Sequence, residues 1–152
     1  MKFYEITEDN CNFFVNDLII KNIDFSNPSE LEKLLKNIML IIKKKYHVLM
    51  NGLYYVDIYV NKNAGAFIYM ERNDSFIRSK EIDMKIKIVF DDNFFFKTSV
   101  YEILKNELGV YYYENYYYIK TSKLNNLVKY IEYGDIIYDS DLDIENIGTK
   151  IN

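Results

Sequence analysis

The chain has 152 residues, 49% of them hydrophobic, and a net charge of −4, which together fit a soluble globular domain. No segment reaches the roughly 18 consecutive apolar residues that span a membrane, and charge at Lys2 comes too early for a signal peptide, so we expect a cytoplasmic protein without a membrane partner. Arg72 and Arg78 are the only arginines of this acidic chain, which makes nucleic acid a poor candidate partner.

The first residues predict short strands. Residues 2–6 and 12–15 alternate short apolar runs with polar residues, and the polar residues between them suit a turn. Residues 17–23 fit either a third short strand or an irregular connection. The expected start of the fold is therefore two or three strands.

A helix and a β-hairpin follow. Asn27 can cap a helix, Pro28 suits its first position, and apolar residues then recur at helical spacing, which predicts a helix over residues 28–46. Residues 53–60 and 66–71 read as two strands joined by a turn rich in Asn and Gly. The first half thus contains two or three strands, one helix and a hairpin.

The second half predicts a second set of elements. Residues 72–81 are the most polar interior stretch, and they are the one candidate boundary in what we interpret as a single compact domain over residues 1–152. The predicted order beyond them is strand, helix, strand, strand, helix, strand, over residues 84–90, 99–108, 110–113, 116–120, 121–134 and 135–138.

This order is the β-α-β-β-α-β arrangement of ferredoxin-like folds. We therefore predict an α+β protein with an antiparallel or mixed sheet and about three helices. The tail from Asp139 is acidic, and we expect it to be loosely held.

The single histidine and the single cysteine each allow two interpretations. His47 is either a general base or a side chain that satisfies the last carbonyl groups of the helix before it. Cys11 is either a nucleophile or a small apolar core residue, and it cannot form an intramolecular disulfide. With one residue of each type, the usual zinc ligand sets cannot form, so we expect no metal and no cofactor.

The acidic residues are equally ambiguous. Asp91 and Asp92 either take part in acid-base chemistry or form a turn. The alternating carboxylates from Asp139 to Glu145 superficially match a calcium loop, but the sixth and twelfth positions of that loop, normally Gly and Glu, are here Ile144 and Lys150. We interpret this segment as a solvated tail.

Six tyrosines form the most distinctive stretch of the sequence. They flank Glu114-Asn115 in a predicted hairpin and are Tyr111, Tyr112, Tyr113, Tyr116, Tyr117 and Tyr118. Because side chains alternate along a strand, they must occupy both faces of the hairpin. Three explanations are open for this tyrosine content. The tyrosines serve core packing in a protein encoded by AT-rich codons, they form a protein interface, or they form a surface for nucleic acid or a small ligand.

Several segments resemble the MecA family of adaptor proteins. The hairpin over residues 51–68 resembles that of the family's N-terminal domain, and residues 110–118 resemble the aromatic hairpin of its C-terminal domain. Residues 130–134 are similar to the segment after that hairpin and residues 147–151 to the end of the domain, so the resemblance covers about a third of the chain. It implies a non-enzymatic adaptor that carries substrates to a Clp-type unfoldase, although this chain lacks the family's long charged linker.

These observations lead to two hypotheses for function. The first is a non-catalytic protein-binding module, adaptor-like or inhibitory, that uses the tyrosine hairpin to bind another protein. The alternative is a small enzyme or ligand-binding domain with carboxylates and tyrosines in a pocket, for which Asp57, Glu71 and Asp92 are candidates. Because the sequence contains no recognisable catalytic motif, we favour the non-catalytic module over an enzyme.

Overall fold

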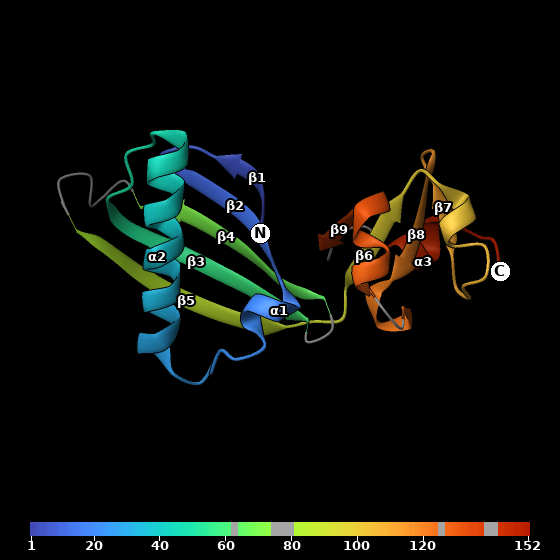
Figure 1. Ribbon diagram of the computed structural model, residues 1–152, viewed down its shortest axis with the longest axis horizontal. Coiled ribbons are helices and arrows are strands. Elements are labelled where there is room, and N and C mark those ends of the chain that lie inside the picture. The colour runs from blue at the N-terminus through green and yellow to red at the C-terminus, as the bar shows by residue number, and fades with distance from the viewer. Residues whose placement is uncertain (62–63, 74–80, 125–126, 139–142) are drawn as a thin grey trace. The chain divides into compact units, whose positions relative to one another are not determined.

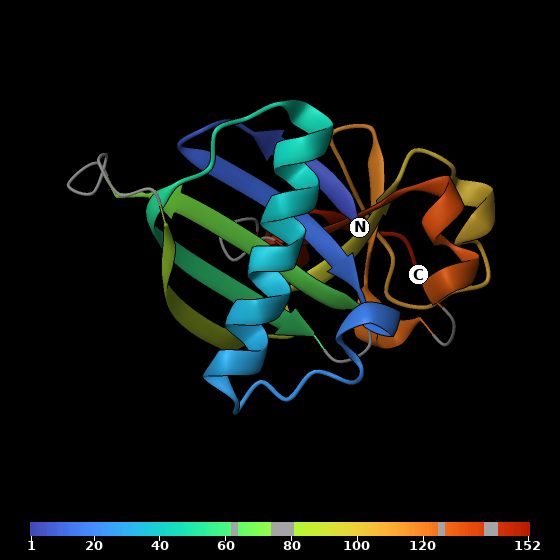
Figure 2. The same ribbon diagram turned by 60° about the vertical axis from the view of Figure 1, so that its left-hand side comes forward.

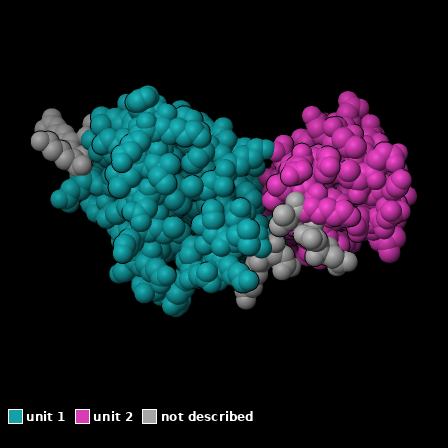
Figure 3. All heavy atoms as spheres, viewed as in Figure 1, with its two compact units in different colours: residues 1–90 teal, residues 91–152 magenta. Residues whose placement is uncertain are grey.

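The computed structural model describes residues 1–61, 64–73, 81–124, 127–138 and 143–152 (Figure 1). The chain divides into two compact units, Met1–Phe90 (unit 1) and Asp91–Asn152 (unit 2), coloured separately in Figure 3. The predicted α+β class is confirmed, because the described residues form three α-helices and two five-stranded sheets. None of the described helices is both long and apolar enough to cross a bilayer. A single domain over residues 1–152 stays a prediction.

Unit 1 consists of one sheet covered on one face by a helix (Figures 1 and 2). Its elements are β1 (Lys2–Ile6), β2 (Asn10–Asn16), α1 (Asp17–Ile20), α2 (Pro28–Tyr46), β3 (Gly52–Asn61), β4 (Gly65–Arg72) and β5 (Ile82–Phe90). The strand order is β1-β2-β4-β3-β5, and each pair of neighbours is antiparallel except β3 and β5, which are parallel.

The long helix begins and ends where the sequence predicts. The Asn27 side chain accepts a hydrogen bond from the Glu30 backbone N–H at 3.4 Å, and His47 ends the helix in a left-handed conformation with φ of 54°. The strand considered for residues 17–23 is wrong, because α1 forms there instead. The Asn16 side chain caps α1 by accepting a hydrogen bond from the Ile19 N–H at 3.3 Å.

The core of unit 1 lies between α2 and the sheet. Alternate residues of β3 face the helix: Tyr54, Val56, Ile58 and Val60 are all buried. The helix contributes its own buried residues to the same cluster: Leu31, Leu35, Ile38, Met39 and Ile42. This apolar stripe fixes which face of α2 meets the sheet.

Truncation of a buried residue of α2 is expected to destabilise unit 1. Leu35 is 0% exposed, so Leu35→Ala removes buried methyl groups and leaves a cavity, at a cost of about 2–5 kcal/mol in the free energy of unfolding. Leu40 lies on the same helix and is 51% exposed, so Leu40→Ala should change that free energy by less than about 0.5 kcal/mol. Urea unfolding followed by far-UV circular dichroism tests both variants, and equal effects would contradict this packing.

The ferredoxin-like arrangement expected for the second half is not confirmed. The strand that was expected to begin it is β5, which belongs to the first sheet and pairs with β3 from Gly52↔Ile82 to Val60↔Phe90. Segment 72–81 therefore connects two strands of one sheet, and the division of the chain falls after Phe90.

Unit 2 has a second, antiparallel sheet. Its elements are β6 (Phe94–Thr98), β7 (Tyr111–Tyr113), β8 (Tyr116–Lys120), β9 (Asp135–Tyr138), α3 (Ile144–Ile147) and β10 (Thr149–Lys150). The strand order is β10-β7-β8-β6-β9. The strands β7, β8 and β9 were predicted, whereas β6, α3 and β10 were not.

The two helices predicted for this half are short 3₁₀ turns instead. They are η2 (Tyr101–Ile103), η3 (Thr121–Lys123), η4 (Leu127–Lys129) and η5 (Ile131–Tyr133). The first of them begins after Val100 and has no side-chain cap, and the Thr98 hydroxyl accepts a hydrogen bond from the Val100 N–H at 3.1 Å. A segment this short forms an α-helix only when tertiary packing favours it.

The end of the chain is packed into unit 2 rather than loosely held. Ile144 is 0% exposed, and Glu145 forms an ion pair with Lys120 at 3.1 Å. The strand β10 pairs with β7 through Thr149↔Tyr112. Residues 139–142, the first four positions of the sequence compared with a calcium loop, lie outside the described residues.

Candidate functional site

The tyrosine hairpin is formed by β7 and β8 as predicted. Glu114 and Asn115 make its two-residue turn, and their φ angles of 45° and 68° are both left-handed. This is the pattern of type I′ turns, which match the twist of the two strands they join. The tyrosines face one another in three pairs: Tyr111↔Tyr118, Tyr112↔Tyr117 and Tyr113↔Tyr116.

Alternation along the strands places the tyrosines on both faces, which confirms that prediction. Tyr112 and Tyr117 share one face, and the other four share the opposite face. On the first face, the Tyr117 ring lies 5.1 Å from the Tyr101 ring and 5.0 Å from the Tyr112 ring, centroid to centroid. Such tilted contacts are favourable for aromatic rings.

Most of the tyrosines on the second face serve packing. Tyr118 is 3% exposed and forms a small core with Phe95 and Ile144. Tyr111 and Tyr113 are half-buried against the same cluster. The structure therefore gives three of the six tyrosines to this core, and Tyr118 is inaccessible to a partner.

Two tyrosines near the turn stay exposed. Tyr112 is 37% exposed and its hydroxyl donates a hydrogen bond to the Asn115 side chain at 3.1 Å, and Tyr116 is 40% exposed. We call Tyr112, Glu114, Asn115 and Tyr116 the tip patch. Its two rings lie on opposite faces of the hairpin, on either side of the turn. All four residues are exposed, and they combine two aromatic rings with one carboxylate.

The chemistry of the tip patch favours a cation. The Lys97 ammonium lies 3.9 Å from the centroid of the Tyr116 ring, so this ring already takes part in a cation–π contact. A hydrogen bond with the Glu114 side chain raises the pKa of Tyr113, which keeps that phenol protonated. Unit 2 has 11 acidic and 6 basic residues, whereas unit 1 has 12 and 13, so the negative charge of the chain resides in unit 2.

The candidate catalytic carboxylates are divided between the two units. Asp57 and Glu71 lie on neighbouring strands of unit 1, on the sheet face opposite α2, whereas Asp92 belongs to unit 2. Asp91 supports the turn interpretation, because one of its carboxylate oxygens accepts a hydrogen bond from the Asn93 N–H at 2.9 Å. The other oxygen accepts one from the Tyr138 hydroxyl at 3.0 Å.

The lone cysteine is buried in the core of unit 1, whereas the lone histidine lies exposed at the end of a helix. Cys11 is 0% exposed in the core of unit 1, and this burial, together with the negative charge of Glu5, raises the pKa of its thiol to about 12. His47 ends α2 and its side chain is exposed. Among the described residues no group of His, Cys, Asp and Glu side chains is arranged to hold a metal ion.

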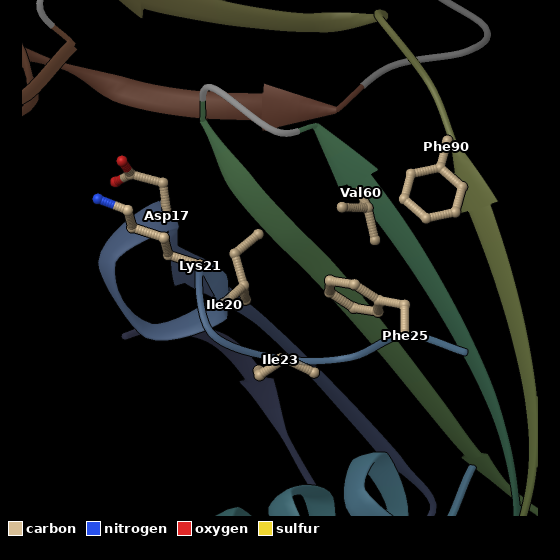
Figure 4. A pocket seen from close by; sticks show the side chains of 7 residues that line it. All are labelled: Asp17, Ile20, Lys21, Ile23, Phe25, Val60 and Phe90. Atoms are coloured by element: carbon tan, nitrogen blue, oxygen red, sulfur yellow. The ribbon is translucent and has the colours of Figure 1, made fainter. Parts of the chain in front are cut away.

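A pocket in unit 1 was missed by sequence reasoning. It has a volume of about 360 Å³ and is lined by residues from α1, from the segment after it, and from the ends of β3 and β5 (Figure 4). Its lining residues are Asp17, Ile20, Lys21, Ile23, Phe25, Val60 and Phe90. None of the predicted site residues is among them, and the sequence offered no signal, because these side chains meet only after the strands have paired.

Comparison of the chain with protein-family models, curated proteins and solved structures gives no match. The resemblance to MecA adaptors therefore stays a prediction from the sequence.

Proposed function

We propose that the protein is a non-catalytic protein-binding module that engages a basic partner through the tip patch. The observation that carries the proposal is the exposure of Tyr112 and Tyr116, one on each face of the hairpin, next to a turn that contains the exposed residue Glu114; the other tyrosines of the hairpin are packed. Tyrosine is enriched at the points of protein interfaces that contribute most to binding energy.

The structure of the hairpin supports this use of the tip patch. The strands β7 and β8 are held on both sides by β10 and β6, so the turn is presented on a paired sheet rather than on a free loop. The tyrosine side chain has few rotatable bonds, so binding costs it little conformational entropy. A guanidinium or ammonium group of the partner can stack on an exposed ring while pairing with Glu114.

An adaptor-like or inhibitory role fits such a module, and both roles are part of the proposal. The resemblance to MecA adaptors suggests a Clp-type unfoldase as the first partner to test.

Substitution of the exposed tyrosines tests the proposal. Tyr112→Ala and Tyr116→Ala should each weaken partner binding by about tenfold or more, because each removes the exposed ring from one side of a tip that the partner grips from both faces. Tyr133→Ala is the matched control, since Tyr133 is a tyrosine of the same unit that is 54% exposed but lies in η5. Capture of a Clp-type unfoldase, and of other proteins from lysate of the source organism, measures the effect, with circular dichroism to confirm folding.

The control defines what would contradict the proposal. If all three variants capture the same partner as strongly as the unaltered protein, the tip patch is not the interface. If Tyr133→Ala alone loses the partner, binding uses a different surface of unit 2.

A further inference from the structure

We infer that unit 1 binds a free α-amino acid with a large apolar side chain in the pocket of Figure 4. Its volume of about 360 Å³ is at the lower end of the range for small-molecule sites, which favours a ligand of this size. The pocket lies wholly within unit 1, and the inference is independent of the tip patch.

The apolar part of the pocket is well defined. Ile20 and Val60 are 7% and 2% exposed, and both belong to the core of unit 1. The rings of Phe25 and Phe90 meet edge to face, with centroids 6.0 Å apart and an angle of 81° between their planes. Phe90 is nevertheless 60% exposed, so an apolar group placed against it would remove aromatic surface from water.

The charged part of the pocket lies at its other end. Figure 4 shows the Asp17 carboxylate and the Lys21 ammonium beside each other, away from the rings of Phe25 and Phe90. They are one helical turn apart, and the Lys21 N–H donates to the Asp17 carbonyl oxygen at 2.8 Å, which fixes that turn. Neither side chain forms an ion pair with another residue in the described part of the chain.

This separation of charge and apolar surface specifies the ligand. A zwitterion satisfies both groups, because its carboxylate pairs with Lys21 and its ammonium pairs with Asp17. A simple fatty acid or a phosphate would bring negative charge towards Asp17, which opposes binding. A free α-amino acid carries both charges on one carbon atom and directs its side chain along the aliphatic wall towards the two rings.

Four related compounds test each part of the assignment on the full chain. L-Phenylalanine should bind with a Kd of about 1 mM or tighter in an NMR titration, with shifts at the Ile20 and Ile23 methyl groups. N-acetyl-L-phenylalanine lacks the ammonium, L-phenylalanine amide lacks the carboxylate, and L-alanine lacks the large side chain. Each should bind at least about tenfold more weakly. The first two also represent residues at the ends of a peptide, so they separate a free amino acid from a chain terminus.

Amino-acid substitutions test whether Lys21 and Asp17 bind the two charges of the ligand. Lys21→Met and Asp17→Asn should each weaken L-phenylalanine binding by at least about tenfold. Lys21 is exposed and Asp17 is partly exposed, and circular dichroism checks that each variant keeps the fold. Lys44→Met, at an exposed lysine of α2, should not change it. The Tyr112→Ala variant should also bind normally, which distinguishes this site from the tip patch. The inference is overturned if L-phenylalanine causes no shifts up to about 10 mM, or if the blocked compounds bind as well as it does.

Discussion

Gly65→Ala is expected to destabilise unit 1 by more than about 3 kcal/mol. Gly65 begins β4 with a φ of +136°, a conformation that residues with a Cβ atom rarely adopt. It is also paired on both sides, with Asn16 of β2 and Asn61 of β3. An added Cβ atom would overlap the carbonyl oxygen of Val15, which is backbone and has no room to move within the sheet.

A second glycine provides the control for this prediction. Gly109 has a φ of +81°, but a Cβ atom there would meet only the side chain of Lys123, which can move away. Gly109→Ala should therefore cost only the backbone strain, about 1 kcal/mol. Urea unfolding followed by NMR resolves signals from each unit, so the cost of Gly65→Ala is read from unit 1 and that of Gly109→Ala from unit 2. Similar costs for the two variants would show that β2 and β4 are not as closely paired as described.

The Cys11 thiol is expected to react about a thousandfold more slowly in the folded protein than in the unfolded chain near pH 8. Only the thiolate is nucleophilic, and burial raises the pKa of this thiol from 9.0 to about 12, so little thiolate is present. Alkylation by iodoacetamide, followed by mass spectrometry with and without urea, measures the ratio. An exposed cysteine, introduced by Ser29→Cys in a Cys11→Ala background, should react as fast with as without urea.

The same pKa shift makes the stability of unit 1 depend on pH in a defined direction. The folded state holds the thiol proton more tightly than the unfolded state, so its stabilising effect is complete below about pH 9 and is lost as the pH rises towards 12. Burial also raises the pKa of Tyr4 to about 12, which acts in the same direction above pH 10. Cys11→Ala should flatten the loss that begins near pH 9, and an unchanged pH profile would contradict the buried position of the thiol.

Local signals in the sequence were sufficient for several elements. The helix over Pro28–Tyr46 was predicted at both ends, because Asn27 caps it and its apolar residues repeat at helical spacing. The strand Asp135–Tyr138 and the hairpin of β7 and β8 were also predicted, since alternation and turn residues are properties of short segments. The positions of the six tyrosines along this hairpin could therefore be inferred, although not which of them stay exposed.

The features that the sequence did not predict depend on contacts between segments that are distant along the chain. Residues 84–90 were correctly predicted as a strand, but nothing in their alternation says that they pair with β3 rather than with a later strand. The strand β6 was missed because Phe94, Phe95 and Phe96 are all buried, so neither face shows the polar residues that mark a half-exposed strand. The pocket in unit 1 depends in turn on the pairing of β3 with β5, and could not be found without it.

The pairing order of the first sheet also constrains how unit 1 assembles. The β1–β2 and β3–β4 hairpins join neighbouring segments, but β2 finds its second partner only in β4, after α2 and β3 have been added to the chain. Contacts of such sequence separation slow folding, because the intervening chain must be ordered first. During synthesis on the ribosome, the inner edge of β2 stays unpaired until residue 72 has emerged, so the β1–β2 hairpin carries an open, aromatic edge throughout that interval.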